Sequence, residues 1–472
     1  MLFTQRKPNI KTALPGPKAQ AMIARDEAYT SPSYTRDYPL AVDHGEGCWL
    51  TDVDGNEFLD LTAGIAVCAT GHSHPKVVDA VTEQAKKLIH MSGTDFFYGP
   101  MGELAERLAD TAPWGKHGTR VFFTNSGTES VEAAFKLARY ATGRKRMVAF
   151  QGAFHGRTMG SLSLTASKIT QVRGFTPLVP GVTHVPYGYC YRCAYNLKYP
   201  SCGIHCVWTL DENLFTSMCP PDEVAALIVE PIQGEGGYVV PPPGYLEALR
   251  ELTQKHGILL IFDEVQSGMG RTGKLWAHEH WDVQPDIITS AKGIASGMPL
   301  GAMIARKELM DWPPGSHATT FGGNPVACAA ALATLDLLES ELMENATTVG
   351  SYLVEKLHAL QKKYPVIGDV RGKGLMVGAE LIEEPNTPPL TPREEIQEET
   401  GEDLAGVSIG RDLFPGRNAT RRDAIVQLAF QKGLLLLGCG RNALRFSPPL
   451  IVTKGEVDVA MDILDQCFAE TA

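Results

Sequence analysis

Long apolar stretches are missing from this sequence, and no segment approaches the roughly 18 consecutive apolar residues that a membrane-spanning helix requires. Residues 1–20 carry basic side chains but no apolar core followed by small residues, so they do not resemble a secretory signal. No run of Lys or Arg is long enough to bind a phosphate backbone, and the formal net charge is −11, which disfavours binding to nucleic acid. We therefore expect a cytoplasmic protein without a membrane or nucleic-acid partner.

Cysteine is sparse outside one short segment. Six of the ten cysteines stand alone in apolar or mixed surroundings, as buried reduced thiols usually do, and this argues against disulfides there: Cys48, Cys68, Cys219, Cys328, Cys439 and Cys467. With 472 residues, of which 44% are hydrophobic and 21% charged, the chain has the composition of a globular protein. Its length predicts a large domain and a smaller one.

Short β-branched runs alternate with helical patterns through the middle of the chain. This alternation predicts an α/β fold whose large domain has a mostly parallel central sheet flanked by helices. The predicted strands lie at 120–124, 146–150, 225–229, 258–262 and 286–289, and a polar residue directly follows each of them. Because ligands bind beyond the carboxyl ends of parallel strands, these polar residues are the first candidates for chemistry.

The two ends of the chain are expected to build a smaller α+β domain. Residues 50–60 alternate polar and apolar around Asp54-Gly55, which predicts an antiparallel hairpin. After about residue 340 the pattern changes to a helix through 353–360 and two short strands near 374–380 and 443–446. The predicted division is an N-terminal segment at 1–75, a large domain at 76–340 with a cysteine-rich insertion at 187–210, and a C-terminal small domain at 341–472. Within the last, residues 383–422 are predicted as a surface excursion.

A candidate phosphate site lies at Asn125-Ser126-Gly127-Thr128-Glu129, between an apolar strand and an Ala-rich helical stretch. This position places backbone N–H groups and a hydroxyl at a helix N-terminus, where the helix dipole and the unpaired donors favour a phosphate. A simple N-cap is the alternative, because Ser and Thr are common there.

Two charged residues lie within three positions of the end of a predicted apolar strand. Asp263 comes after the run 258–262, where burying a carboxylate is costly without a cationic partner such as a protonated pyridine nitrogen. A helix cap is the alternative role for Asp263. Lys292 lies just past the strand 286–289 between small residues, where desolvation would leave the neutral amine that Schiff-base formation requires. Most lysines, however, are only solvated surface charges.

Six motifs occur in order along the chain: NSGTE at 125–129, FHGRT at 154–158, EPIQGEGG at 230–237, DEVQSG at 263–268, KG at 292–293 and TFGGNP at 320–325. Together they closely resemble the class III aminotransferases, which include ornithine, acetylornithine and 4-aminobutyrate aminotransferases. The resemblance runs from about Tyr38 to Leu450, interrupted by the cysteine segment and by residues 383–422. It implies fold type I, pyridoxal 5′-phosphate (PLP) as cofactor, amino-acid and 2-oxo-acid substrates, and a homodimer or dimer-based oligomer with a shared active site.

The resemblance also implies a role for each cofactor-site residue. Lys292 resembles the lysine that carries PLP as a Schiff base and moves the substrate proton, and Asp263 resembles the partner of the pyridine nitrogen. Phe154 would stack on the ring, with a core aromatic as the alternative. The remaining cofactor residues are Gln266, a donor to the phenolic oxygen; Gly127 and Thr128, the phosphate cradle; Thr320, a phosphate ligand from the neighbouring subunit; and His155 and Val265, which belong to the same motifs.

Five residues are expected at the substrate. Arg157 resembles the arginine that binds a substrate carboxylate, and Arg445 resembles a second such arginine with Glu235 as its switchable partner. An ordinary structural salt bridge is the alternative for both arginines. Ile65 stands where 4-aminobutyrate enzymes carry an aliphatic residue, whereas Tyr38 resembles a tyrosine that ornithine enzymes use on the substrate. The preferred amino donor stays open between these two.

The reaction itself has two interpretations. The first is transamination, which alternates between PLP and pyridoxamine phosphate in a ping-pong cycle. The second is amino-acid racemisation on the same scaffold, because some class III relatives are racemases. Both reactions need Lys292, Asp263 and the phosphate site, so the sequence leaves the choice open.

The remaining four cysteines cluster at Cys190, Cys193, Cys202 and Cys206, in a segment that departs from the better-known members of the family. Thiolates at these spacings could form a tetrahedral structural zinc site or an iron–sulfur site, and His205 is an alternative ligand. The same cysteines could instead be reduced structural thiols, or could form two disulfides.

Overall fold

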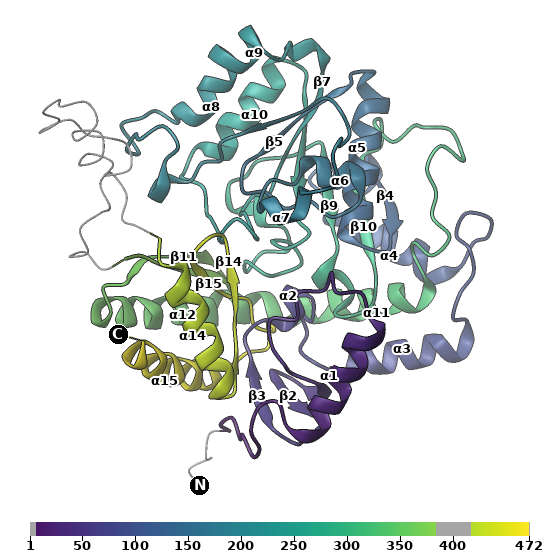
Figure 1. Ribbon diagram of the computed structural model, residues 1–472. Helices are drawn as coiled ribbons and strands as arrows, with labels where there is room; N and C mark the ends of the chain where they lie inside the picture. The colour runs from purple at the N-terminus through teal and green to yellow at the C-terminus, as the bar shows by residue number, and fades with distance from the viewer. Residues whose placement is uncertain (1–5, 384–416, 472) are drawn as a thin grey trace, which may run out of the picture.

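The computed structural model describes residues 6–383 and 417–471, and its largest unit is a seven-stranded sheet (Figure 1). The strand order is β4-β10-β9-β8-β7-β5-β6, with bounds Thr119–Thr124, Gly301–Arg306, Ile287–Ser290, Leu259–Asp263, Val224–Val229, Arg146–Phe150 and Val182–Val185. β10 is antiparallel to its neighbours β4 and β9, and the other pairings are parallel. All strands except β10 therefore end at the same edge of the sheet. The five predicted strands are confirmed as β4, β5, β7, β8 and β9.

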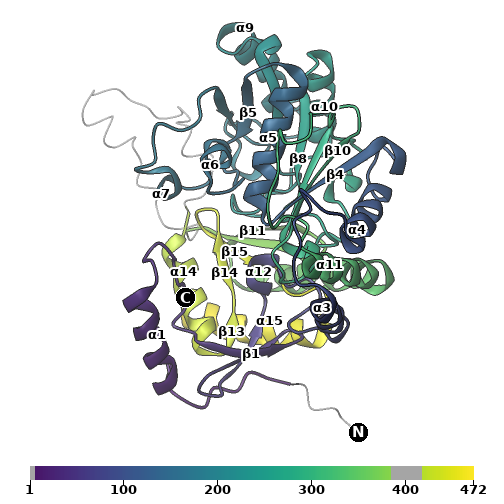
Figure 2. The same ribbon diagram turned by 90° about the vertical axis from the view of Figure 1, so that its right-hand side faces the viewer.

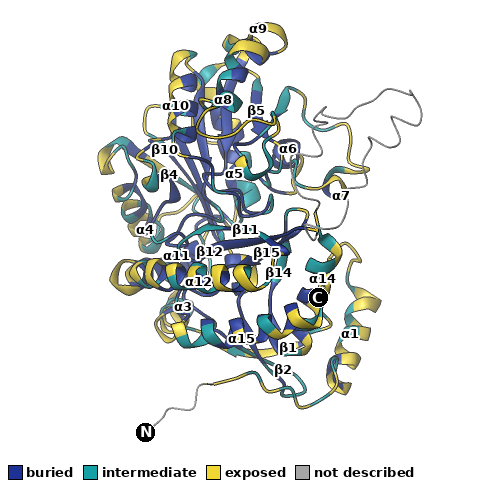
Figure 3. Cartoon of the chain, turned by 90° about the vertical axis from the view of Figure 1, so that its left-hand side faces the viewer, coloured by how far each residue is buried: buried dark blue, intermediate teal, exposed yellow. Residues whose placement is uncertain are grey.

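Helices on the two faces of this sheet create two separate hydrophobic cores. α5 (Gly127–Thr142) contributes to one core and α10 (Tyr245–Lys255) to the other. Successive residues of β7 alternate between them, since Ala226 and Ile228 join the α5 core while Leu227 and Val229 join the α10 core. Burial on both faces explains why this strand is apolar at every position. Figure 3 shows the buried strands between helices whose outer sides are exposed.

The two ends of the chain meet in a second sheet. The predicted hairpin is confirmed: β1 (Val42–Glu46), β2 (Trp49–Asp52) and β3 (Glu57–Asp60) form an antiparallel meander. β13 (Leu434–Leu435), from the far end of the chain, then pairs in parallel with β3. Residues near both termini therefore share one sheet, which lies below the large sheet in Figure 1 beside α1 (Pro17–Tyr29).

A third, antiparallel sheet is built from the C-terminal part of the chain. Its strand order is β11-β12-β15-β14, with bounds Ile367–Lys373, Met376–Leu381, Ala443–Phe446 and Leu437–Cys439. Three helices lie beside it, α12 (Met343–Lys363), α14 (Ala419–Gln431) and α15 (Lys454–Glu470), as Figure 2 shows. The predicted helix through 353–360 is confirmed as part of α12, and the two predicted strands are β12 and β15.

The remaining helices connect and cover these sheets. They are α2 (Ala63–Ala66), α3 (Pro75–Lys87), α4 (Gly99–Asp110), α6 (Met159–Leu164), α7 (Ile169–Val172), α8 (His205–Thr209), α9 (Phe215–Ser217) and α11 (Pro325–Leu337). Within the described residues, none of the helices has both the length and the apolar character needed to cross a membrane.

The junction toward the C-terminal part is helical. A single π-helical turn, Leu338–Leu342, joins α11 to α12, so the predicted domain boundary at 340 falls inside this turn. The division at 75 and 340 stays a prediction. Of the predicted surface excursion at 383–422, residues 384–416 lie outside the described residues. Its last residues are α14 instead, because Asn418 caps that helix by accepting a hydrogen bond from the Arg421 N–H at 3.0 Å.

Candidate active site

A pocket of about 360 Å³ opens at the edge where the parallel strands end. Its walls come from the segments that follow β4, β5, β7, β8 and β9, and from the turn that leads into β10. Eight of the nine predicted cofactor-site residues line it, together with the predicted substrate residue Arg157. The eight are Gly127, Thr128, Phe154, His155, Asp263, Val265, Gln266 and Lys292. The prediction that polar residues at the strand ends converge is therefore confirmed.

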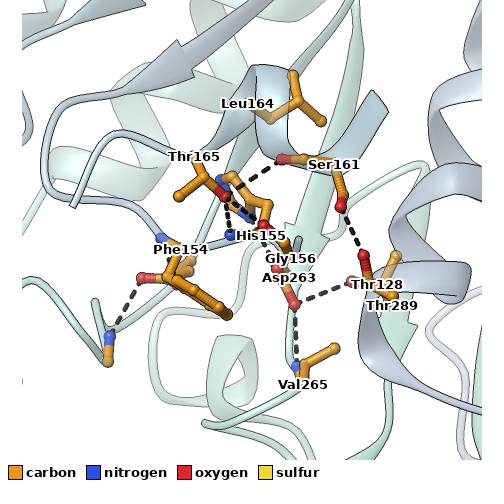
Figure 4. A network of polar contacts seen from close by, with 12 residues as sticks. Thr128, Phe154, His155, Gly156, Ser161, Leu164, Thr165, Asp263, Val265 and Thr289 are labelled. Carbon is orange, nitrogen blue, oxygen red and sulfur yellow. Dashed lines mark hydrogen bonds and ion pairs between the residues drawn. The ribbon is translucent and has the colours of Figure 1, made fainter. Parts of the chain in front are cut away.

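Asp263 is buried at the base of this pocket, with a relative exposure of 4%. Figure 4 shows its carboxylate in a network of donors. His155 Nδ1 lies 2.7 Å from one oxygen, and the other accepts hydrogen bonds from the Thr289 hydroxyl at 3.0 Å and the Val265 N–H at 3.1 Å. The next helical element after β8 begins only at Ala277, so Asp263 does not cap a helix. Its proposed role as a charge partner remains.

Lys292 begins the short 3₁₀ turn that follows β9 and lies on the pocket wall. Its backbone is left-handed, with φ +42°, which costs a non-glycine residue about 1 kcal/mol or more. Burial lowers the pKa of Lys292 below its usual value, and the neighbouring carboxylates of Asp263 and Glu230 oppose that shift. Desolvation thus favours the neutral amine, which is the nucleophilic form.

Glu230 is a buried pocket carboxylate to which the sequence argument gave no role. It directly follows β7, as Asp263 ends β8, so the same signal could have identified it. It accepts hydrogen bonds from the N–H groups of Gly234 at 3.1 Å and Phe154 at 3.2 Å. Burial raises the pKa of Glu230 to about 7, although the nearby His155 lowers it. At neutral pH this carboxyl therefore exists in both protonation states.

The N-terminus of α5 forms the opposite end of the pocket. Ser126 is the N-cap, and the Glu129 carboxylate accepts a hydrogen bond from the Asn125 N–H at 2.7 Å. Ser126 thus takes the N-cap role that was the alternative to phosphate binding. The first N–H groups of the helix still have no intrahelical acceptor. A Cβ at Gly127 would lie 2.7 Å from Val265 Cγ1, so only glycine allows this close approach.

The hydroxyl of Thr128 fixes the FHGRT segment against α5. It accepts hydrogen bonds from the N–H groups of Arg157 and Thr158, both at 3.2 Å, and lies 2.5 Å from the Ser161 hydroxyl. A Cβ at Gly156 would lie 2.2 Å from Thr128 Oγ1, which explains the glycine at that position. Thr128 therefore connects the proposed phosphate site to the segment that carries Phe154, His155 and Arg157.

Gln266 and Arg157 lie along the pocket wall and mouth. The side-chain oxygen assigned to Gln266 is buried and has no hydrogen-bond partner among the described residues. The guanidinium of the exposed Arg157 stands 5.7 Å from the centre of the Phe154 ring. The pocket therefore holds an unused polar group inside and a cation at its mouth.

Arg445 and Glu235 meet, as predicted, close to the pocket. Arg445 lies on β15 with a relative exposure of 6%, and its Nη1 is 3.2 Å from a Glu235 oxygen. The other Glu235 oxygen is 2.6 Å from Lys168 Nζ. Lys168 received no role in the sequence argument, because it lies in an irregular segment far from Glu235 in sequence. Glu235 thus stands between a buried cation and a half-exposed one.

Besides Arg445 and Glu235, three further predicted residues lie outside the residues that line this pocket. Tyr38 hydrogen-bonds through its hydroxyl to the carbonyl of Leu436, and Thr320 is exposed. Ile65 lies 44% exposed in the left-handed turn 63–66, with φ +66°. A β-branched residue in this conformation is strained, and such strain concentrates at functional sites.

The four clustered cysteines lie apart from the active-site pocket, around a second, smaller cavity of about 20 Å³. All four are free thiols, so the two disulfides considered from the sequence are not formed. Burial raises the pKa of Cys190 to about 11 and that of Cys206 to about 12, and the neighbouring cysteines add to both shifts. The four cysteines therefore line one cavity, as their clustering in sequence suggested.

Comparisons with known proteins agree with this site. The family model "Aminotransferase class-III" matches residues 30–468. An alanine/serine racemase from Pyrococcus horikoshii is 38% identical over 98% of this chain and 93% of that protein. An acetylornithine aminotransferase from Methanopyrus kandleri is 47% identical over 76% of this chain and 86% of that protein.

The fold is likewise similar to that of a solved transaminase. An amine transaminase from an uncultivated Pseudomonas species, in its PLP-bound form, has a TM-score of 0.81 and 33% identity, with 94% of this chain and 98% of that chain covered. The chain therefore belongs to the class III pyridoxal-phosphate-dependent aminotransferase family.

Proposed function

We propose that this enzyme transfers an amino group from an ω-amino or basic amino acid, such as 4-aminobutyrate, ornithine or acetylornithine, to a 2-oxo acid such as 2-oxoglutarate in a ping-pong cycle. The pair of Arg445 and Glu235 carries this proposal. Glu235 neutralises Arg445 when the substrate lacks an α-carboxylate. When it moves toward Lys168, Arg445 is free to bind the α-carboxylate of a 2-oxo acid or glutamate.

The residues of the active-site pocket fit PLP. The volume of about 360 Å³ is within the range of small-molecule sites, and the N-terminus of α5 suits the phosphate. Asp263 offers a charge partner to the pyridine nitrogen, and the buried amide of Gln266 can orient toward the phenolic oxygen. When bound, PLP supplies an electron sink for the carbanion chemistry of amino acids.

The protein's own groups then have distinct tasks. The desolvated amine of Lys292 anchors the cofactor covalently and afterwards accepts the proton that leaves the substrate Cα. His155 and Thr289 keep the Asp263 carboxylate in one orientation. Arg157, at the pocket mouth, binds the second substrate carboxylate.

A homodimer is part of the proposal, because Thr320 does not line the pocket of its own chain. Beside it lies an exposed apolar surface that includes Ile89, Phe96, Phe97 and Phe321. The two segments that form it are tied together, since the Asn324 side chain donates to the Ile89 carbonyl at 2.9 Å. Such a surface indicates a protein–protein contact, in which Thr320 would reach the phosphate of the neighbouring subunit.

Racemisation of an α-amino acid is the second candidate, favoured by the near full-length match to the alanine/serine racemase. Both reactions use the same cofactor and lysine. They differ in where the proton is returned, at the cofactor carbon for transamination or at the opposite face of the substrate Cα for racemisation.

The test incubates the purified holoenzyme with 4-aminobutyrate, ornithine, acetylornithine, alanine and serine, each with and without 2-oxoglutarate. The proposal expects glutamate from at least one ω-amino donor and only in the presence of 2-oxoglutarate. Formation of a D-amino acid without any 2-oxo acid, and no glutamate from any donor, would replace it with the racemase.

A further inference from the structure

The cysteine loop, residues 187–210, is a second structured site for which the aminotransferase reaction has no use. Cys190 begins a 3₁₀ turn that ends just before Cys193, and Cys206 lies in the first turn of α8. Between Cys202 and Cys206, Gly203 and Ile204 are left-handed, with φ +56° and +59°. These turns bring cysteines that are three, nine and four positions apart in sequence around one cavity.

We propose that this loop holds one zinc ion through the sulfurs of Cys190, Cys193, Cys202 and Cys206. All four residues line the same cavity, and all four are free of disulfides. Four protein sulfurs complete a tetrahedral shell, so the ion has no open position for a substrate. The site is structural and separate from the PLP pocket.

The size and chemistry of the cavity select a single soft-ligand ion. Its volume of about 20 Å³ is close to that of one water-sized sphere, which suits a single ion. Its lining contains no carboxylate, and apolar groups such as Leu197, Ile204 and Pro242 surround the thiols. Calcium and magnesium require oxygen ligands, whereas thiolates bind soft metals, among which zinc takes the four-sulfur tetrahedral shell.

Binding draws the sulfurs inward. Within the described residues, the one group of three potential metal ligands whose ligand atoms all lie within 4.8 Å of one another is His155, Glu230 and Asp263, which belongs to the PLP pocket. Four thiolates at about 2.3 Å from zinc lie about 3.8 Å apart, so the cysteine loop closes around the ion as it binds. Metal binding therefore orders the loop and releases thiol protons.

The loop also contacts the C-terminal sheet, which gives the ion a mechanical role. Tyr189 and Arg192, on either side of Cys190, both hydrogen-bond to the carboxylate of Glu380 on β12. Glu380 is 1% exposed and also accepts from Arg371 at 2.9 Å. An ion bound to Cys190 and Cys193 would also hold Arg192, which lies between them. It would therefore stabilise the contact of the cysteine loop with the C-terminal sheet.

The first experiment measures zinc, iron and acid-labile sulfide in holoenzyme purified without metal-affinity resin from zinc-supplemented cells. We expect about one zinc per chain, and neither iron nor sulfide. Cys190→Ser and Cys202→Ser should lose most of the zinc and melt at a lower temperature. The matched control is Cys219→Ser, a buried cysteine outside the loop, which should keep its zinc.

A second measurement avoids dependence on variants that fail to fold. Cobalt added to chelator-treated wild-type protein should give the intense sulfur-to-cobalt charge-transfer absorption of a four-thiolate site, and zinc should displace it. The proposal is overturned by zinc-free protein that takes up no cobalt, by iron with sulfide, by a thiol titration that finds two disulfides, or by Cys190→Ser protein that retains wild-type zinc.

Discussion

At the scale of single residues, Lys292 combines two features that favour covalent chemistry, a strained backbone and a desolvated amine. We predict that Lys292→Ala abolishes turnover and the borohydride-stable attachment of PLP, because the variant has no amine at that position. Intact-mass analysis after borohydride reduction measures the attachment. The control is Lys168→Ala, which removes a lysine outside the pocket lining and should still be labelled. Stable labelling of the Lys292→Ala protein would refute the assignment.

Glu230 predicts a pH dependence of stability in the cofactor-free protein. Its pKa is raised in the folded state to about 7, so the folded protein keeps this proton while the unfolded chain has lost it. Stability contributed by this group therefore falls as pH rises from about 4.5 to about 7, by up to about 3 kcal/mol.

We expect Glu230→Gln to remove that part of the pH dependence. Urea unfolding of cofactor-free protein at pH 5 and pH 7.5 measures it, and the variant should gain relative to wild type at the higher pH. Glu103→Gln, at an exposed position on α4, is the matched control and should follow wild type at both pH values. An equal wild-type-to-variant difference at the two pH values would contradict the prediction.

Apart from the family resemblance, the prediction of charged site residues from sequence used one signal, a charged group within three positions of the end of an apolar strand. That signal identified Asp263 and Lys292, and it was present but unused for Glu230. It could not find Lys168, because its contact with Glu235 is made by an irregular segment whose path only the folded chain defines.

At the scale of elements, the site depends on β15, which carries Arg445, meeting the loop that carries Glu235. We predict that Glu235→Ala lowers the ratio of kcat/KM for ω-amino donors to that for α-amino donors, because Arg445 then remains an uncompensated cation. Loss of a charged hydrogen bond worth about 1.4 kcal/mol or more corresponds to about tenfold in this ratio.

Lys168→Ala gives the opposite expectation. Without Lys168, Glu235 pairs with Arg445 alone, so the ratio should rise. Steady-state kinetics with 4-aminobutyrate and glutamate as donors measures both variants. If neither variant changes the ratio, the pair is an ordinary salt bridge and the racemase gains support.

Prediction of elements was most successful where the periodicity was simple. The strands that run parallel were found from their apolar runs, apart from β6. The antiparallel β10 was missed, since its role depends on insertion between β4 and β9, a long-range pairing that no local pattern encodes.

At the scale of the whole molecule, the proposed dimer predicts complementation between two inactive subunits. In a hybrid of Lys292→Ala and Thr320→Ala chains, one site combines an intact lysine with the intact threonine of the other chain. Random pairing of equal amounts should therefore restore about a quarter of wild-type activity.

Co-expression with two affinity tags, purification of the hybrid and a transamination assay test this. The Thr320→Ala homodimer must itself be impaired, and mixed homodimers that cannot exchange subunits serve as the control. Absence of rescue in the isolated hybrid would place Thr320 in the site of its own chain, or outside the site.

The pairing of β13 with β3 has a consequence for the order in which the chain matures during synthesis. Leu59 finds its partner Leu434 only after nearly the whole polypeptide has left the ribosome. Until then the edge of the N-terminal hairpin exposes unpaired backbone groups, which can pair with another nascent chain. We therefore expect truncation before Leu434 to leave an aggregation-prone product, even when the large parallel sheet is complete.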